Sequence, residues 1–365
     1  MALNTWDGST DTDWDTAANW TTTGVTDRVP TSADDVIIPD TSSLNNPTLG
    51  GTGYAKSLTI SANGTLVGNA NKIIIYGEAD GSGATTNGYA VDIDGIISGS
   101  FDLDVRTDAA TNVDLVPSSG TIRNLVINHA DAVVNIRSAA TTISGNLTIT
   151  AGTLDTANSG SNLDLTVTGE VNVAGTLTCN SSACSFGSLD STGLTNLPDS
   201  SGSTLITNEN SDGLSIVAGT YSTCVPAKIK HNNGTVTFNN HSDPAAHAAI
   251  VCGNSNATDG LYNVIIDGAN TVVDTYDPGG SGQECKIHNN FTVTNGSFQV
   301  NSAGNPFDVG GDVLVSAGKM FGDGAAPTGA MSFGSLTIES GATFRATSGT
   351  TTIVGQPSGD YMLRN

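Results

Sequence analysis

Residues that favour helices and residues that carry positive charge are both scarce in this chain. Only five Glu, six Lys and six Arg occur among its 365 positions. The alanines stand beside Gly, Thr and Ser and do not recur at the three- and four-residue spacing of an amphipathic helix. This composition disfavours an α-helical or an α/β fold.

The shortage of positive charge also disfavours two classes of partner. The 12 basic residues stand against 35 Asp and Glu, which leaves a formal net charge of −23. Proteins bind nucleic acid through contacts from Lys and Arg to phosphates, and anionic membrane surfaces attract the same residues. We therefore expect neither nucleic acid nor a membrane as a partner.

The sequence also lacks the features of a secretory signal and of a membrane-spanning segment. The start, Met1-Ala2-Leu3-Asn4-Thr5-Trp6, lacks the basic and apolar regions of a secretory signal, and no run approaches the roughly 18 apolar residues that span a bilayer. A virion protein that is released by lysis needs no such signal. At the other end, residues 353–355 and 363–365 resemble the start of another coil. We therefore expect this end either to dock on a partner or to result from cleavage of a longer chain.

Apolar residues make up only 37% of the chain, but they follow a pattern. They fall in short alternating triplets such as Leu58-Thr59-Ile60 and Leu147-Thr148-Ile149. Between the triplets lie many of the 44 Gly, with Thr, Ser, Asn and Asp, which are residues of strands and tight turns. So few apolar residues can still bury a long, narrow core if each inward side chain stacks on another.

The triplets belong to a longer repeat. In each copy an apolar-x-apolar triplet is followed by a Gly and then by a small or polar residue before another apolar one. Copies begin at Leu58, Leu147, Val171, Leu214, Phe291, Val313 and Leu336. Leu125 and Leu147 are 22 residues apart, as are Phe291 and Val313, and Leu336 follows Val313 after 23. A period near 22 to 24 with two or three short strands suits one turn of a β-solenoid.

We therefore predict an all-β fold, a right-handed parallel β-solenoid (β-helix) with coils of about 22–24 residues and an N-terminal cap. Inward side chains would stack on their counterparts one coil away, about 4.8 Å along the axis, and glycines would turn the corners. The alternative fold is a β-sandwich with evenly spaced strands. The predicted segments are a capping or docking segment at 1–54, regular coils at 55–190 and 263–365, and irregular coils with longer loops at 191–262.

All three tryptophans, Trp6, Trp14 and Trp20, lie in the predicted cap. The first coil of a solenoid exposes apolar side chains and unpaired strand edges unless something covers them. Three large rings at that end could cover them. The alternative is that the same rings form a docking surface or a sugar-binding site.

The sequence of this first part resembles the opening of known β-solenoid proteins. The matching residues are Trp6-Asp7-Gly8, Trp14, Asn19-Trp20, Gly24, Val29-Pro30 and Asp34-Asp35-Val36-Ile37-Ile38, followed by Ser57-Leu58-Thr59-Ile60 and Gly64-Thr65-Leu66. Such openings occur in bacterial surface adhesins of the filamentous-haemagglutinin and autotransporter type, and in tail fibre, spike or capsid decoration proteins of marine tailed phages. The pattern contains no catalytic residue, so the resemblance transfers none.

The resemblance implies a non-enzymatic structural and attachment protein on the surface of a virion. Its expected partners are other virion proteins, further copies of itself in a homo-oligomer such as a trimer, and a glycan on the host surface. One alternative is a bacterial cell-surface adhesin or filament subunit. Another is a polysaccharide depolymerase of the β-helix tailspike type, which would need two carboxylates at a set separation across a groove.

Candidate site residues are few, and no cofactor is expected apart from a calcium ion. Asp7, Asp11, Asp13 and Asp15 could supply oxygen ligands for calcium, although their order lacks the EF-hand positions of Gly and Glu. The alternative is that they are solvated turn residues. Asp92-Ile93-Asp94 and Asp102-Leu103-Asp104 are interpreted as strands with the aspartates pointing outward.

The cysteines offer one candidate pair. Their number, five, is odd, so at least one has no partner within the chain. Cys179 and Cys184 could close a small loop through a disulfide, or both could be buried thiols. His241, His247 and Cys252 are zinc-capable side chains whose spacing matches no known zinc motif.

Overall fold

The computed structural model describes residues 2–83, 85–158, 161–206, 216–217, 229–239, 248–251, 260–276, 284–300, 304–321, 328–355 and 363–364. Over these residues the chain is all-β, with a single 3₁₀ turn, η1 (Ala17–Asn19), and no α-helix. No helix in this part of the chain is long and apolar enough to cross a membrane. The chain divides into two units, the first comprising 1–168 and 174–178 and the second 169–173 and 179–365.

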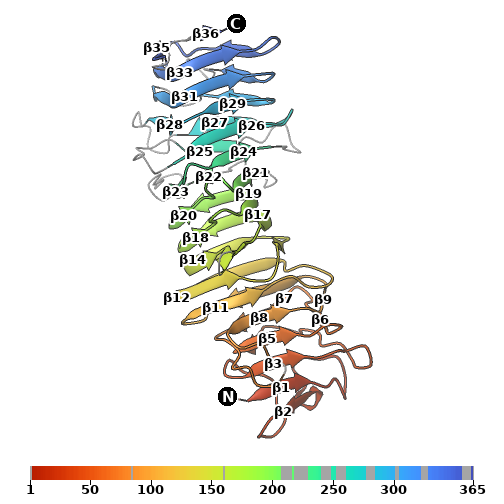
Figure 1. Ribbon diagram of the computed structural model, residues 1–365. Coiled ribbons are helices and arrows are strands. Elements are labelled where there is room, and N and C mark those ends of the chain that lie inside the picture. Colours follow the sequence, from red (N-terminus) through yellow and green to blue (C-terminus); the bar gives the residue numbers. More distant parts are fainter. Residues whose placement is uncertain are drawn as a thin grey trace. The chain divides into compact units, whose positions relative to one another are not determined.

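Parallel strands on three sides build the first unit, and successive coils add rungs to two long ladders and to a third, interrupted one (Figure 1). The first ladder runs through β1 (Leu3–Trp6), β3 (Asp35–Ile38), β5 (Ser57–Ile60), β8 (Tyr89–Ile93) and β11 (Ala110–Asp114), and then through the second halves of β12 (Asn124–Ile136) and β14 (Leu147–Asp155) to β18 (Thr176–Thr178). The second runs through β4 (Gly53–Ala55), β7 (Asn71–Ile75), β10 (Phe101–Val105) and the first halves of β12 and β14. On the third side β6 (Thr65–Val67) and β9 (Ile96–Ser98) form a separate two-stranded parallel sheet, and further along β13 (Thr141–Ile143) pairs with the start of β17 (Leu165–Val173). Isolated bridges at Ile96–Ser119 and Ile122–Ile143 lie between them.

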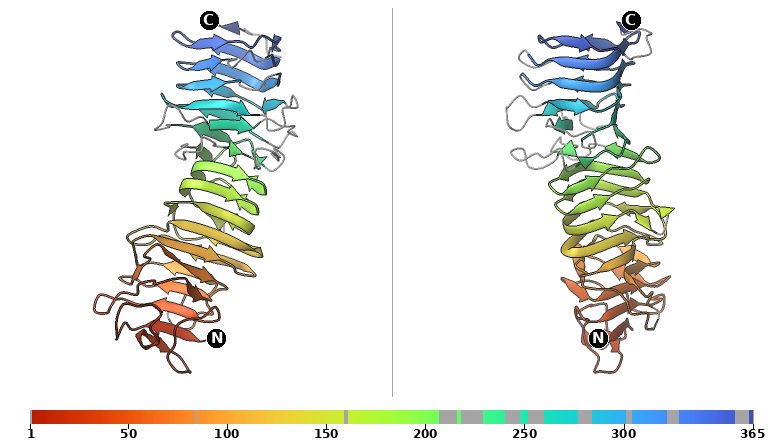
Figure 2. Two further views of the ribbon diagram at one scale, coloured as in Figure 1. Left: turned by 180° about the vertical axis from the view of Figure 1, so that it is seen from behind. Right: turned by 60° about the vertical axis from the view of Figure 1, so that its left-hand side comes forward.

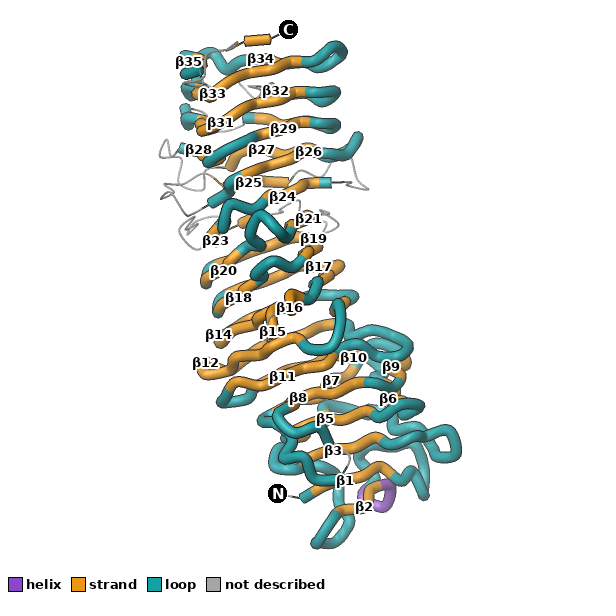
Figure 3. Tube along the Cα trace, in the orientation of Figure 1, coloured by secondary structure: helices purple, strands orange, loops and turns teal. Residues whose placement is uncertain are grey.

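The second unit has the same organisation of three parallel ladders (Figure 3). One ladder runs through β19 (Ala183–Ser191), β21 (Ser203–Ile206), β24 (Thr235–Phe238), β26 (Asn263–Ile266), β29 (Phe291–Val293), β31 (Phe307–Val315), β33 (Met331–Ile338) and β36 (Leu363–Arg364). The next starts at the end of β19 and includes β22 (Ile216–Val217), β25 (Ala248–Val251), β27 (Val272–Tyr276), β30 (Ser297–Gln299), β32 (Lys319–Phe321) and β34 (Thr343–Arg345). The last includes β20 (Leu194–Asn196), β23 (Ile229–Lys230), β28 (Cys285–Ile287), the starts of β31 and β33, and β35 (Thr351–Ile353).

Register partners confirm the repeat that the sequence shows. Leu125 pairs with Leu147, Phe291 with Val313, and Val313 with Leu336, and these are the pairs that the spacing in the sequence predicts. Coils longer than the expected range also occur. One separates the register partners Leu58 and Val91, and another separates Thr195 and Ile229. The second of these falls in the segment where longer loops were expected.

The core lies between the three ladders of each unit. Alternate side chains point inward, so Leu58, Val91 and Val113 stack along the first ladder with at most 1% of their surface exposed. At the corners glycine is required: Gly152 has φ of +80°, and a Cβ there would lie 2.4 Å from the carbonyl oxygen of His129. Figure 2 shows the resulting stack of strands in each unit from two further sides.

The long coil between β5 and β8 covers part of the outer surface. Within it, a Cβ at Gly83 would lie 2.6 Å from Leu3 Cδ2 and 3.6 Å from Ile37 Cδ1, so this loop packs over β1 and β3. Ile37 occupies an outward position yet is only 4% exposed. Sequence periodicity did not reveal this cover, because a loop that packs on an outer face interrupts the repeat.

Residues 1–54 are not only a cap in front of the coils, because they already contribute rungs to the first ladder. β1 and β3 pair in parallel and already form rungs of the first ladder, because Val36 and Ile38 continue the inward column of Leu58 and Ile60. The additional element is β2 (Trp20–Thr22), which pairs antiparallel with β1 and so covers the free edge of the first rung. The regular coils therefore begin before residue 55.

Candidate functional site

The three tryptophans form one buried cluster at the start of the first unit. Trp20 is fully buried and makes edge-to-face contacts with Trp6 and Trp14, at ring-centroid distances of 5.0 Å and 4.7 Å. Its Nε1 donates a hydrogen bond to the carbonyl oxygen of Trp14 at 2.8 Å, and Trp6 Nε1 donates to the carbonyl of Asn45 at 2.6 Å.

Burial decides between the two interpretations of these rings. Trp6 and Trp14 are each 1% exposed, so none of the three indoles offers a face to a sugar or to another protein. The rings instead pack on one another, with Trp20 of β2 in contact with both of the others. This arrangement agrees with a capping role and does not form the docking surface or sugar site considered as the alternative.

The aspartates beside the cluster stabilise turns. Asp7, Asp11 and Asp13 each accept a hydrogen bond from the backbone N–H two residues further on, at 2.8–3.0 Å. Asn19 Nδ2 also donates to Asp11, at 2.6 Å. In the part of the chain that the structure describes, these carboxylates and Asp15 do not converge as a set of three metal ligands. They have the geometry of turn residues, which was the alternative to a calcium site.

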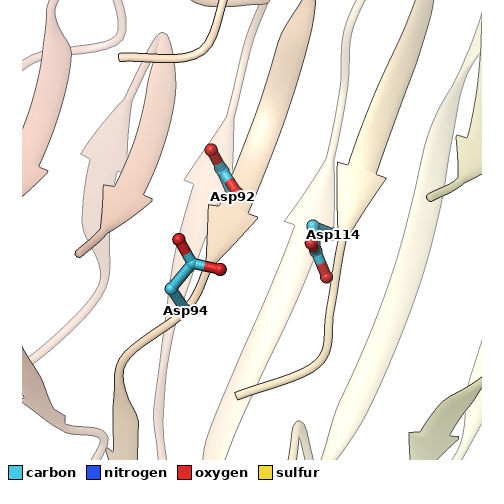
Figure 4. Close-up of side chains that lie close together, drawn as sticks. All are labelled: Asp92, Asp94 and Asp114. Atoms are coloured by element: carbon cyan, nitrogen blue, oxygen red, sulfur yellow. The ribbon is translucent and has the colours of Figure 1, made fainter. Parts of the chain in front are cut away.

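Three other aspartates do converge. Asp92 belongs to β8 and Asp94 follows directly after that strand, while Asp114 ends β11, the next rung of the same ladder (Figure 4). One carboxylate oxygen from each lies within 4.8 Å of the others. The sequence interpretation of Asp92 and Asp94 as outward residues is correct, but it missed the third member. The repeat length could have identified Asp114, because this residue follows Asp92 after one coil length and is its register partner.

Mutual repulsion and burial shape this cluster. Asp114 is 7% exposed. Burial raises the pKa of Asp114, and the charges of Asp92 and Asp94 raise it further, against hydrogen bonds from Ser138 and from the Val116 backbone that lower it. Thr86 donates its hydroxyl hydrogen to Asp92. Calcium takes six to eight oxygens, so three carboxylates could supply only part of its coordination shell.

We expect Asp114→Asn to stabilise the protein at pH 7, by about 1 kcal/mol or less, because it removes a like charge from the cluster. A raised pKa in the folded state means that wild-type stability falls as the pH rises above about 4, the ordinary pKa of Asp. The gain should therefore be present at pH 7 and absent near pH 3. Thermal unfolding at both pH values measures it.

The exposed Asp94 provides the matched control. Asp94→Asn should give a smaller gain because its carboxylate is already solvated. A loss of stability in Asp114→Asn at pH 7 would show that the carboxylate charge is needed, and would contradict the repulsion inferred from the cluster.

The remaining candidates are the cysteine pair and the zinc-capable side chains. Cys179 and Cys184 are both buried, and Cys184 lies in β19. The Ser182 N–H donates to the Cys179 carbonyl at 3.0 Å, which closes a turn between the two. A disulfide between them stays a prediction. His241, His247 and Cys252 lie outside the described residues.

Comparison with known proteins reaches only the start of the chain. A family model described as "Domain of unknown function (DUF8693)" matches residues 5–83. No curated protein and no solved structure matches the chain. The matched segment contains the tryptophan cluster, β2 and the first rungs of the ladders.

Proposed function

We propose that this chain is a non-enzymatic structural and attachment protein of a virus particle, a fibre, spike or decoration component that adheres to a glycan on the host surface. The observation that carries the proposal is the stack of parallel rungs in each unit, with a core of aliphatic and aromatic side chains that are almost fully buried. Such a stack presents long ordered outer faces. The resemblance of the opening segment to phage and adhesin solenoids supports the same role.

The proposed solenoid is right-handed. Parallel strands joined by a crossover connection in one sheet adopt the right-handed sense in about 98% of cases, because of the twist of the strands. We further propose that the chain forms a homo-oligomer, such as a trimer, with other virion proteins as neighbours. Light scattering after size-exclusion chromatography gives the number of copies.

A depolymerase of the tailspike type is the alternative that carboxylate geometry addresses. Glycosidases hold their two carboxyl groups about 5–5.5 Å apart when they retain configuration and about 6.5–9.5 Å apart when they invert it. The cluster of Asp92, Asp94 and Asp114 brings one carboxylate oxygen of each residue within 4.8 Å of the others, so it is the place in the described chain to examine first for such a pair. A reducing-sugar assay with host polysaccharide tests this point, and rapid sugar release would favour the depolymerase.

Purified particles provide the test of the main proposal. The chain should be found in them by mass spectrometry, antibodies against it should label their surface, and the same antibodies should block adsorption to host cells. Labelling of the bacterial envelope in cultures without particles would instead favour the cell-surface adhesin. Absence from both would contradict an attachment role.

A further inference from the structure

Successive rungs of the second unit carry uncharged side chains in one outward column. The column lies on the ladder that runs from β19 to β33, and Figure 3 shows these strands one above another. Its members are partly exposed, while their neighbours along the strand point into the core, as Val264 and Ile266 do on either side of Ile265. Each member is the register partner of the next, in the order Ser185, Leu205, Thr237, Ile265, Thr292, Leu314 and Thr337.

Large and small side chains alternate along this column. Leu205, Ile265 and Leu314 occupy every second rung, and the smaller Thr237 and Thr292 lie between them. Because successive rungs are about 4.8 Å apart, the aliphatic side chains stand about 10 Å apart with a gap between each two. A surface with this alternation is complementary to itself once it is shifted by one rung.

A two-fold axis parallel to the strands, midway between β26 and β29, produces that shift. Such an axis turns a second copy over, so that the two sheets face each other and their rungs run in opposite directions. The same patch then meets itself, as in the isologous contacts of two-fold dimers. Every aliphatic side chain of the column lies opposite a threonine of the second copy. The opposing pairs are Ile265 with Thr292, Leu314 with Thr237, and Leu205 with Thr337.

Acidic residues beside the column are staggered by the same axis. Asp312 lies on one side of the column, and Asp267 and Glu339 lie on the other, each two residues along its strand from a column member. An axis parallel to the strands keeps each side over itself. It places Asp312 opposite Thr235 of the second copy, and Asp267 opposite Thr294. Residue 207, which would lie opposite Glu339, is outside the described residues.

Charge explains why this stagger matters. The chain has a net charge of −23, and a charge of this size keeps copies of a protein apart. A contact between two copies therefore needs a face on which acidic side chains are absent or do not oppose one another. The column meets the first condition, and the described acidic residues beside it meet the second. Burial of Leu205, Ile265 and Leu314 in such a contact would remove apolar surface from water and drive association.

We propose that this face, the column from Ser185 to Thr337 with the residues beside it, binds a second copy of the chain in an antiparallel two-fold contact. The inference rests on the proposed homo-oligomer and names its contact surface and its symmetry. A contact of this symmetry builds a pair of copies and not a trimer. All residues of the face belong to the second unit.

Light scattering after size-exclusion chromatography of the full chain should give the mass of two copies for the wild type and of one copy for Ile265→Asp. The two-fold axis repeats the buried carboxylate, so the dissociation constant should rise at least about a hundredfold. The matched control is Val354→Asp, which adds the same charge at an aliphatic residue of the second unit that is 67% exposed and lies outside the face. It should pair like the wild type, and circular dichroism should show unchanged strand content in both variants.

Thr292→Leu tests the shape of the face. It adds apolar surface, so unspecific apolar association would become stronger. In the two-fold contact the new side chain meets Ile265 of the other copy, and pairing should weaken on the order of tenfold because the contact is overpacked. Exchanging the two residues, Ile265→Thr together with Thr292→Ile, again opposes a large and a small side chain. This double variant should pair within about threefold of the wild type.

Cross-linking tests the direction of the two copies. Residues 205 and 337 are five rungs apart in one chain, about 24 Å, but lie opposite each other between copies. Facing sheets are about 10 Å apart, so a short bis-maleimide should join a Leu205→Cys chain to a Thr337→Cys chain in a mixture. It should not join chains in either variant alone. The wild type gives the background from the native cysteines.

The outcomes separate this inference from the proposed function. If Ile265→Asp pairs as well as the wild type, the face is wrong while the homo-oligomer stands. Linking of Leu205→Cys chains to one another would overturn the antiparallel direction, and tighter pairing of Thr292→Leu would overturn the match of large and small side chains. A wild type that stays a single copy at every concentration would overturn both the contact and the homo-oligomer. The attachment role would then still depend on the tests with purified particles.

Discussion

Replacing Phe307 by alanine should lower the free energy of unfolding by about 3–5 kcal/mol, the cost of removing a large buried aromatic side chain. Phe307 is fully buried in β31. Its ring lies 4.9 Å from Phe298 and 5.7 Å from Phe291, measured between ring centroids. Phe333, its neighbour one coil further on, lies at 6.3 Å. The substitution therefore opens a cavity in the cluster of phenylalanines that the three ladders of the second unit enclose.

Denaturant unfolding followed by far-ultraviolet circular dichroism measures this change. Thr292→Ala is the matched control, because Thr292 is an outward residue of the neighbouring strand β29 and its loss should change the stability by no more than about 0.5 kcal/mol. A loss below about 1 kcal/mol in Phe307→Ala would mean that this side chain is not enclosed by neighbouring coils.

Trp20→Ala should be comparably severe, with a loss of about 3–5 kcal/mol. Trp20 contacts both other indoles and donates to the Trp14 carbonyl, and β2, in which it lies, covers the edge of the first rung. Without the ring the cap should loosen and expose the edge of β1. Exposed strand edges pair with other chains, so this variant should also aggregate.

Two measurements separate the effects in the cap. Denaturant unfolding gives the stability, and light scattering at rising protein concentration gives the aggregation. Trp20→Phe should keep most of the packing and lose the indole hydrogen bond, worth about 1 kcal/mol. If Trp20→Ala remained monodisperse and as stable as the wild type, the tryptophan cluster would not be a cap.

The aliphatic columns could be predicted from the sequence alone. Each inward residue must stack on its counterpart, so spacing such as that from Leu125 to Leu147 gives the register directly, and the structure pairs these two residues. The same rule places Val313 between Phe291 and Leu336. Inward positions are predictable because in every coil the same positions must carry apolar side chains that are buried in the core.

Outer surfaces could not be predicted to the same degree. The loop around Gly83 packs over Leu3 and Ile37, and no periodic requirement determines where an insertion folds. The antiparallel return of β2 onto β1 breaks the parallel pattern for the same reason, because it occurs once. The sequence predicted a calcium site at the aspartates near Asn19, but in the structure these carboxylates accept backbone hydrogen bonds within turns. Closely spaced aspartates are typical both of turns and of metal sites, so the sequence alone does not distinguish the two.

The carboxylate cluster shows what the period adds to a search for sites. Asp92 and Asp114 are separated by one coil length and become neighbours. A sequence search for local motifs misses this pair, because its members come from different coils. Adding the coil length to each outward polar residue would have found it.

A crystal structure of the full chain tests the central claim most directly. We expect parallel rungs with three strands in each coil, Leu125 beside Leu147 in the first unit, and Phe291 beside Val313 in the second. Two facing antiparallel sheets, with these pairs separated, would contradict the stacked coils and remove the basis for the proposed attachment role.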